Sequence, residues 1–207
     1  MDIEDLTQAC RVGDNDTVVA ILAEGKVDVN QRDRRNVTPL MWAMGRNQTT
    51  VVSTLLACPT IELDRKDVSG GTALHWAASN NHRAVIALYC QHKSCRALVL
   101  NRKAKDGSAA LHCAVYWDNL ECVEELDKLE GINFRAKDDY GDSVVDIARK
   151  QNSERVLKYL LARRKKVESL KDLAAFSVAE HMRCASDIDH LEIPFTLHSL
   201  VEKYLDS

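Results

Sequence analysis

Residues 72–78 read Thr-Ala-Leu-His-Trp-Ala-Ala, and this stretch is the clearest copy of a phrase that the chain repeats. The core of the phrase is an aliphatic residue followed three positions later by Ala. It occurs five times, at Leu6/Ala9, Leu40/Ala43, Leu74/Ala77, Leu111/Ala114 and Val145/Ala148. Successive copies lie 34, 34, 37 and 34 residues apart. A period of roughly 20 to 50 residues is typical of stacked units that cannot bury their apolar faces alone. The repeat therefore predicts a solenoid.

Each unit also carries a second apolar stripe and a turn signal. The second stripe begins nine residues after the Ala and has helical spacing: Val18/Ile21, Val52/Leu55, Ile86/Tyr89, Val123/Leu126 and Leu157/Leu160. Polar phrases at 33–36, 67–70, 104–107 and 138–141 end in Asn or Gly, which tolerate a positive φ. Thr38 and Thr72 offer N-capping hydroxyls, and Pro39 suits an early helical position. Each unit is therefore expected to contain a tight hairpin and two short helices.

With these features the chain resembles the ankyrin-repeat family, whose signature is Thr-Pro-Leu-His-x-Ala-Ala. The resemblance covers about residues 1–161 and implies an all-α solenoid of five helix-turn-helix units with short hairpin loops. The expected units are 1–32, 33–66, 67–103, 104–137 and 138–166, followed by a helical C-terminal module at 167–207. The three extra residues between the third and fourth units are expected to form a longer loop within 90–98. The resemblance also implies a concave groove that holds a protein or peptide partner.

Composition narrows the functional class. The chain has 207 residues, of which 45% are apolar and 29% charged, with a net charge of −3, so it lacks the basicity of a direct nucleic-acid binder. No apolar run reaches the roughly 18 residues of a membrane helix, and the N-terminus does not resemble a secretion signal. Seven cysteines make an odd number, which favours reduced thiols. We therefore expect no membrane association and a location in the cytoplasm, the nucleus or both.

Motifs for catalysis are missing from the sequence. There is no phosphate-binding Gly-rich loop, nucleophile elbow or His-Glu-x-x-His phrase, so we expect a non-enzyme without a cofactor. Cys90, His92 and Cys95 offer zinc ligands, but no second cluster supplies the remaining one, so no metal is expected. His75 and His112 occupy the structural His position of the family, where the ring is expected to bond to neighbouring backbone.

Two tryptophans are the leading candidates for partner binding. Trp42 and Trp76 each stand two residues after the signature Leu, so stacking is expected to place them at the same height on neighbouring helices. In the family this position faces the groove, where large aromatics are typical binding anchors. The alternative is that the indoles fill space between repeats. Tyr116, two residues after Ala114, is the next candidate.

The same tryptophans allow a second functional hypothesis, a methyl-lysine (histone) reader. The phrases Pro39-Leu-Met-Trp-Ala43 and Leu74-His-Trp-Ala77 are similar to those with which the ankyrin domain of certain histone lysine methyltransferases binds methylated lysine. Indoles attract a methylated ammonium through cation–π interaction. In that family a further cage Trp falls at Val37 and an acidic partner at Gly45, and this chain has neither.

Basic residues immediately before the hairpins point toward a different ligand. They are Arg32, Arg65, Lys66, Arg102, Lys103 and Lys137. A file of cations along one edge of the groove favours an acidic or phosphorylated peptide and repels a basic histone tail. The alternative is ordinary solvated charge in turns.

The C-terminal residues suggest an adaptor. Leu170, Leu173, Ala174 and Val178 share one helical face, and a second amphipathic run follows Ile193 and Pro194, with Leu197 and Tyr204 on it. This segment is similar to a suppressor-of-cytokine-signalling (SOCS) box, which implies contacts with elongin B/C and a cullin in a ubiquitin ligase. The family has Cys in place of Ala174 and Leu-Pro-x-Pro in place of 191–194. The alternatives are a helical pair that caps the solenoid and, for the whole chain, a plain scaffold.

Overall fold

The computed structural model describes residues 3–92, 95, 97–129 and 131–167. The chain divides into two parts, residues 1–156 and 157–207, each of which is larger than a single repeat unit. The described helices are α1 (Ile3–Val12), α2 (Asn15–Ala23), α3 (Pro39–Gly45), α4 (Thr49–Leu56), α5 (Ala73–Ser79), α6 (Arg83–Cys90), α7 (Ala97–Leu100), α8 (Ala110–Tyr116), α9 (Leu120–Asp127) and α10 (Val144–Lys150). Residues 154–167 are helical as well. The described part contains no strand, only an isolated bridge between Lys137 and Ser143.

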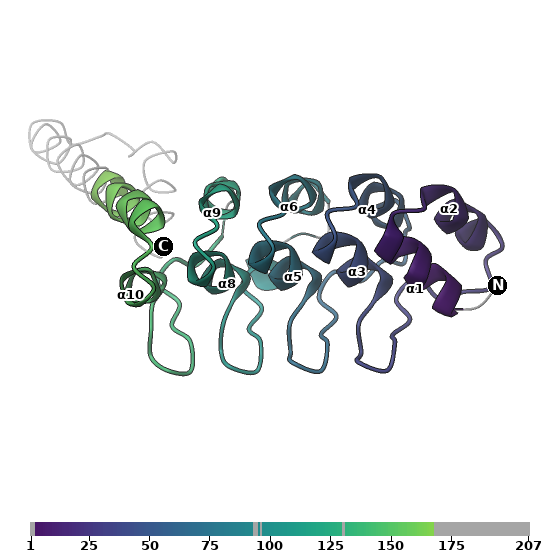
Figure 1. The fold of residues 1–207 in the computed structure, drawn as a ribbon, viewed down its shortest axis with the longest axis horizontal. Helices are drawn as coiled ribbons and strands as arrows, with labels where there is room; N and C mark the ends of the chain where they lie inside the picture. The colour runs from purple at the N-terminus through teal and green to yellow at the C-terminus, as the bar shows by residue number, and fades with distance from the viewer. Residues whose placement is uncertain (1–2, 93–94, 96, 130, 168–207) are drawn as a thin grey trace, which may run out of the picture. The chain divides into compact units, whose positions relative to one another are not determined.

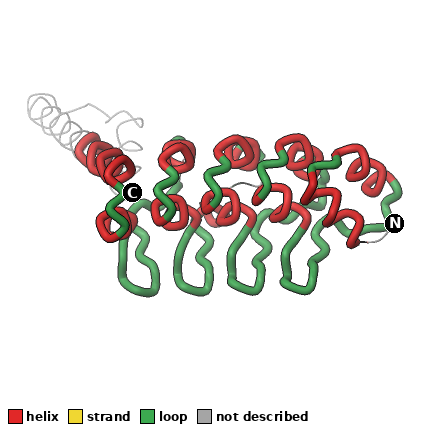
Figure 2. Tube along the Cα trace, in the orientation of Figure 1, coloured by secondary structure: helices red, strands yellow, loops and turns green. Residues whose placement is uncertain are grey.

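Within residues 1–156 the helices form two rows (Figure 1). In the first row α1, α3, α5, α8 and α10 contact one another in that order, and in the second row α2, α4, α6 and α9 do the same. Each first-row helix from α1 to α8 also contacts the second-row helix that follows it in the chain. The loops before α3, α5, α8 and α10, here called the hairpin loops, project from the first row to one side (Figure 2). The stacked helix pairs confirm the predicted helix-turn-helix solenoid in this part of the chain.

The two apolar stripes form the core between the rows. Leu40, Leu74 and Leu111 of the first stripe are at most 2% exposed. The second-stripe residues from Val18 to Leu126 are equally buried. In α10 the stripe is shifted by one position, because Val144, Ile147 and Ala148 are buried whereas Val145 is only partly buried. Residues 144, 147 and 148 still have the i, i+3, i+4 spacing that lines one helical face.

The start of α3 follows the predicted chemistry, and at the start of α5 the hydroxyl of the predicted cap Thr72 lies 2.8 Å from Nδ1 of His75. The hydroxyl of Thr38 accepts a hydrogen bond from the backbone N–H of Met41 at 3.2 Å, and Pro39 is the first residue of α3. In the hairpin loops the expected residues adopt a positive φ, namely Asn36 (58°), Gly70 (81°), Gly107 (75°) and Gly141 (82°). The turn prediction is therefore confirmed.

A second series of positive φ angles escaped the sequence analysis. It comprises the residues that join the two helices of each unit: Gly13, Asn47, Asn81, Asp118 and Asn152. These residues follow the same period as the signature phrase. Asn and Asp adopt this conformation more easily than other residues with a side chain, because their short polar groups bond locally. The series is a further sequence signal for the number of units.

The connection between the third and fourth units differs from the expectation of a longer loop. Residues Ala97–Leu100 form one helical turn, α7, between the end of α6 and the next hairpin loop. Two residues of the 90–98 segment, Ala97 and Leu98, thus belong to a helical turn. An insertion next to a short apolar run can close such a turn with local hydrogen bonds, which a period count cannot show.

The predicted adaptor contacts lie outside the described residues. They are Leu170, Leu173, Ala174, Val178, Ile193, Pro194, Leu197 and Tyr204. The expected domain boundary after residue 166 stays a prediction. Among the described helices, none combines the length and the apolar character needed to cross a membrane.

Candidate partner-binding groove

Three hollows lie where the hairpin loops meet the first-row helices. The first hollow, about 530 Å3, is lined by residues of α1, of the loop before α3, and by Trp42. The middle hollow, about 560 Å3, lies between Trp76 and Cys113. The third hollow, about 330 Å3, includes Tyr116, Trp117 and Tyr140. All three hollows lie on the side of the first-row helices that faces the hairpin loops, and we call this surface the groove.

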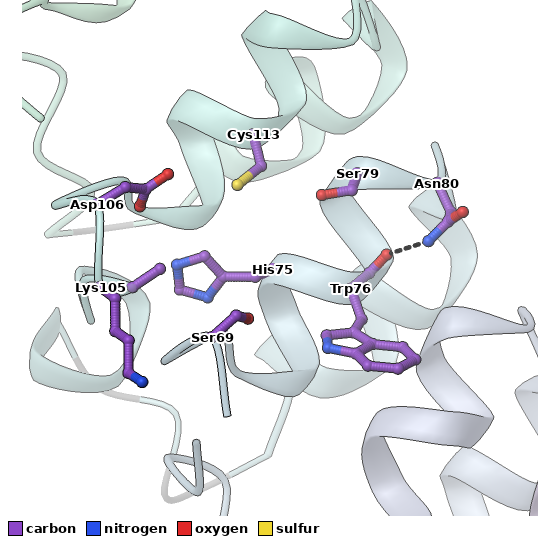
Figure 3. A pocket seen from close by; sticks show the side chains of 10 residues that line it. Ser69, His75, Trp76, Ser79, Asn80, Lys105, Asp106 and Cys113 are labelled. Atoms are coloured by element: carbon purple, nitrogen blue, oxygen red, sulfur yellow. Dashed lines mark hydrogen bonds between the residues drawn. The ribbon is translucent and has the colours of Figure 1, made fainter. Parts of the chain in front are cut away.

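The two signature histidines connect neighbouring units beside the groove. Nδ1 of His75 accepts a hydrogen bond from the backbone N–H of Thr72 at 3.2 Å, which leaves the proton on Nε2. Nε2 then donates to the carbonyl of Ser108 in the next hairpin loop at 3.0 Å, where Figure 3 shows the ring beside the loop of Lys105 and Asp106. His112 repeats the arrangement with Ala109 and the carbonyl of Ala136.

Burial lowers the pKa of both His75 and His112, so both rings are neutral at physiological pH. A neutral ring that bonds to backbone on both sides has no free nitrogen for proton transfer. The prediction of a structural role for the two histidines is confirmed.

Trp42 and Trp76 meet across the interface between α3 and α5. Their ring centroids are 5.4 Å apart and the planes are inclined by 70°, an edge-to-face arrangement that aromatic pairs prefer. Both side chains are partly buried. The predicted juxtaposition is therefore present, and each indole keeps part of its surface accessible in the groove.

Each indole is also anchored to the base of its own hairpin loop. The N–H of Trp76 donates to Oδ2 of Asp67 at 2.8 Å, and the N–H of Trp42 donates to Asp33 in the same way at 3.3 Å. Oδ1 of Asp67 accepts the backbone N–H groups of Ser69 and Gly71 at 2.8 and 2.9 Å. Burial tends to raise the pKa of Asp67, but these bonds and one from the Ser69 hydroxyl outweigh it and lower the pKa. The ionised carboxylate thus fixes both loop and indole.

The middle hollow exists because the fourth unit lacks the tryptophan and the aspartate that anchors it. Cys113 stands at the position of Trp42 and Trp76, and Ala104 stands at the position of Asp33 and Asp67. The small Cys113 side chain leaves space that an indole fills in the two preceding units, and Figure 3 shows its sulfur pointing into the hollow. Burial raises the pKa of the Cys113 thiol to about 11, so the group is a neutral lining residue rather than a nucleophile.

The surroundings of the tryptophans bear on the methyl-lysine hypothesis. Val37 is only 2% exposed and faces the core, so it is not a wall of a cage. At Gly45, an added Cβ would lie 2.7 Å from Cε3 of Trp76, which leaves no room for a carboxylate unless the indole moves. The guanidinium carbons of Arg35 and Arg11 lie 5.2 and 5.9 Å from the centre of the Trp42 ring. Cations of this chain therefore already flank Trp42.

Four of the six predicted basic side chains form hydrogen bonds within the protein. Arg65 bonds to Glu62 at 2.7 Å, and Arg102 bonds to Asp64 at 2.5 Å. Two more of the six bond to backbone one unit further on, since Lys66 donates to the carbonyl of Lys103, and Lys103 donates to the carbonyl of Lys137, both at 2.7 Å. These four side chains are absent from the linings of the three hollows, whereas Arg32 lines the first one.

Two exposed aromatic residues of the groove were missed by the sequence analysis. Tyr116 was predicted and is 50% exposed, but Trp117 and Tyr140 are more exposed still, at 61% and 80%. The rings of Tyr116 and Trp117 form an edge-to-face pair with centroids 5.3 Å apart. An aromatic residue within a turn phrase, as in Asp-Asp-Tyr-Gly at 138–141, is the signal that could have identified Tyr140, because turn residues face solvent.

The possible zinc ligands do not form a site in the part of the chain that the structure describes, where no group of three or more His, Cys, Asp or Glu side chains is placed to hold a metal ion. The thiols of Cys90 and Cys95 share a hydrogen bond, which lowers the pKa of Cys95. The six described cysteines are free thiols.

Comparison with known families agrees with this architecture. A family model described as ankyrin repeats (three copies) matches residues 6–95 and 84–170, well over half of the chain. No curated protein matched the sequence. Ankyrin repeats are protein-interaction modules and are generally not enzymes. The matched span, the stacked helix pairs and the bridging histidines together show that the chain belongs to the ankyrin-repeat family.

Proposed function

We propose that this chain is a non-enzymatic adaptor or scaffold that holds a segment of a protein partner in its groove. The observation that carries the proposal is the edge-to-face pair of Trp42 and Trp76, partly exposed and each fixed by an aspartate. Rigid aromatic side chains make good binding anchors because little conformational entropy is lost when a ligand covers them.

The exposed aromatics Tyr116, Trp117 and Tyr140 support a ligand that extends along several units. They lie around the third hollow, two units further along the stack than Trp42 and Trp76. Exposed aromatic clusters of this kind are common at protein interfaces and uncommon on free surfaces. A ligand that reaches both clusters has to follow the groove.

The test compares partners captured by the full chain and by single variants. Trp42→Ala, Trp76→Ala and Trp117→Ala should each lower the yield of a true partner at least tenfold in quantitative mass spectrometry. Val19→Ala is the matched control, since Val19 is 47% exposed on α2 in the second row. Loss of the same partners from the Val19 variant, or retention by all three groove variants, contradicts groove binding. Circular dichroism checks that each variant is folded.

For the residues beyond the repeats, we propose that the chain recruits its partner to a cullin-RING ubiquitin ligase through elongin B/C. The support is the resemblance of residues 169–205 to a SOCS box, with Leu170, Leu173, Ala174 and Val178 as elongin contacts and Ile193, Pro194, Leu197 and Tyr204 as cullin contacts. Co-expressed elongin B/C should co-purify with the full chain and be lost with Leu170→Glu. Trp42→Ala should retain it. Binding that survives Leu170→Glu eliminates the ligase role and leaves the tail as a structural cap.

The alternative of a methyl-lysine reader is less well supported. A cage for methylated lysine needs electron-rich aromatic faces without competing cations, and Trp42 already has Arg11 and Arg35 beside it. Titration of the chain with a dimethyl-lysine peptide should therefore leave the tryptophan fluorescence unchanged. Saturable quenching at submillimolar peptide would restore this alternative.

We also propose that the protein works in the cytoplasm, the nucleus or both, a location with which free cysteines are compatible.

A further inference from the structure

The first hollow differs from the other two in its charge. The residues that line it include Arg11, Arg32, Arg34 and Arg35, and Asp33, next to Trp42, is the single acidic residue among them. All four arginines are exposed. They come from two separate elements, since Arg11 lies in α1 and the other three lie at and beside the hairpin loop before α3. Tertiary packing therefore brings Arg11 to the same hollow as three arginines that lie more than 20 residues later in the sequence.

The one carboxylate in the hollow is already engaged. Oδ1 of Asp33 accepts the backbone N–H groups of Arg35 and Val37 at 2.8 and 2.9 Å, and Oδ2 accepts the indole N–H of Trp42. Within the described residues, none of the four arginines forms an ion pair. Arg65 and Arg102, in contrast, are paired with acidic side chains. The hollow thus carries excess positive charge, with four arginines against the one carboxylate of Asp33.

Two of the four positive groups, Arg35 and Arg11, are also held in place. The loop of Arg35 is fixed by Asp33 on one side, and on the other its carbonyl accepts the backbone N–H of Val68 from the next loop at 3.1 Å. The Trp42 ring lies beneath Arg35 and Arg11. Donors that are positioned before binding lose less entropy when an anion arrives.

We propose that the first hollow binds a phosphate monoester on the partner segment, an inference that rests on the proposed groove function. Guanidinium groups bind phosphate through paired N–H donors, and a phosphorylated side chain supplies about −1.5 to −2 charges with three acceptor oxygens. Several guanidiniums around one hollow match this charge better than they match a single carboxylate. Phosphorylation of the partner then controls its capture.

The rest of the groove favours a phosphorylated protein over a nucleic acid. The third hollow is lined by Asp106, Asp138 and Asp142, with Lys150 paired to Asp142. A polyanion that follows the groove would therefore meet carboxylates, and the whole chain has a net charge of −3. A polypeptide with one phosphate avoids this repulsion because its charge is local.

The test uses the full chain and a minimal probe, the capped tripeptide Ala-phosphoserine-Ala, with unphosphorylated Ala-Ser-Ala as its partner control. The indole N–H of Trp42 is followed by NMR, since it lies in the hollow and its assignment follows from Trp42→Phe. The phosphorylated probe should bind at least tenfold more tightly than the unphosphorylated one. The double variant Arg32→Ala/Arg34→Ala should weaken it at least tenfold, whereas Arg46→Ala, which removes an exposed charge outside the hollow, should change it less than twofold.

Three results would overturn the proposal: equal binding of both probes, equal loss in the Arg46 variant, or tighter binding of a ten-nucleotide uridine RNA than of the phosphorylated probe. Failure of the anion site is distinguishable from failure of the groove function. If the probe does not bind but Trp76→Ala still loses captured partners, the groove stands without a phosphate site. If both experiments fail, the groove function itself is wrong.

Discussion

At the scale of the residue, Asp67 explains why an indole and a hairpin loop are arranged together. Its two carboxylate oxygens bond to different structures, one to the loop amides of Ser69 and Gly71 and the other to Trp76. Asp33 does the same for Trp42. In the unit with Cys113 at the tryptophan position, the aspartate is also replaced. The fifth unit keeps the aspartate, because Asp138 accepts the loop amides of Tyr140 and Asp142 although Ile147 stands at the tryptophan position. The aspartate therefore fixes the loop wherever it occurs, and in two units it also fixes an indole for a ligand.

Replacement of Asp67 by Ala should lower the free energy of unfolding by about 1–3 kcal/mol, because it leaves partly buried donors without an acceptor. Urea denaturation measures this loss, and the emission of Trp76 should shift to longer wavelength as the indole loosens. Asp67→Asn should lose less, since its amide oxygen can still accept the loop amides. Asp139→Ala, an exposed aspartate of another loop, is the control. Equal effects of Asp67→Ala and Asp139→Ala would refute the paired role.

The signature histidines predict a dependence of stability on pH. Burial lowers the folded-state pKa of His75 and His112 below the unfolded value of about 6.5. The unfolded chain therefore binds more protons, and the free energy of unfolding should fall as pH decreases through 6.5 and be fully recovered above it. Urea denaturation between pH 5.5 and 7.5 tests this range, where carboxylates contribute little. The pH dependence should weaken in His75→Gln/His112→Gln, and an unchanged slope would contradict the assignment.

At the scale of the element, the hairpin loops form a chain of single hydrogen bonds. The N–H of Lys105 donates to the carbonyl of Ser69, and the N–H of Asp139 donates to the carbonyl of Asp106, both at 3.0 Å. With the bond between Val68 and Arg35, each loop is joined to the next. The loops thus form a continuous wall along the groove, although the structure describes no strand in this region.

Two glycines of these loops provide a matched test of that wall. Gly70 and Gly141 have nearly the same positive φ, 81° and 82°. A Cβ on Gly70 would lie 2.7 Å from the backbone N of Lys105 in the next loop, whereas a Cβ on Gly141 would meet nothing within 4 Å. Gly141→Ala should cost about 1–2 kcal/mol from backbone conformation alone. Gly70→Ala should cost more, because it also separates two loops; equal losses in urea denaturation would show that the loop contact is not important.

At the scale of the whole molecule, stability should follow position in the stack. α5 has a first-row neighbour on each side, α3 and α8, whereas α1 contacts α3 alone in its row. In a repeat protein, stability is the sum of unit and nearest-neighbour terms, so units with one neighbour open first.

Leu74→Ala and Leu6→Ala compare the two positions, since both side chains are at most 1% exposed. Leu74→Ala should lower the global free energy of unfolding by about 2–5 kcal/mol. Leu6→Ala should mainly speed hydrogen exchange of amides in α1 and α2 and leave α5 and α8 protected. If Leu6→Ala accelerated exchange in α5 as much as in α1, the chain would behave as one cooperative block instead of a stack.

Much of this organisation was predictable because it is local and periodic. A step of 34 residues returns the chain to the same face of the next unit, so the height match of Trp42 and Trp76 followed from counting alone. The positive φ of Gly70 also follows from a short phrase, and the backbone contacts of His75 follow from the resemblance to the family. The shift of the buried stripe in α10 and the helical turn α7 did not follow, since both depend on packing that a single phrase does not contain.

The sequence by itself determined the repeated unit, its turns and the common height of Trp42 and Trp76, since backbone conformation and hydrophobic spacing are encoded over a few residues. Only the tertiary structure decided which charges remain available to a ligand. Arg102 finds its carboxylate at Asp64 and Lys66 finds a carbonyl at Lys103, more than 30 residues away along the chain. Arg11 is brought beside Arg35 in the same manner. Stacking of units, rather than any local pattern, gives Lys66 and Arg102 partners within the chain. It leaves the arginines of the first hollow exposed to a ligand.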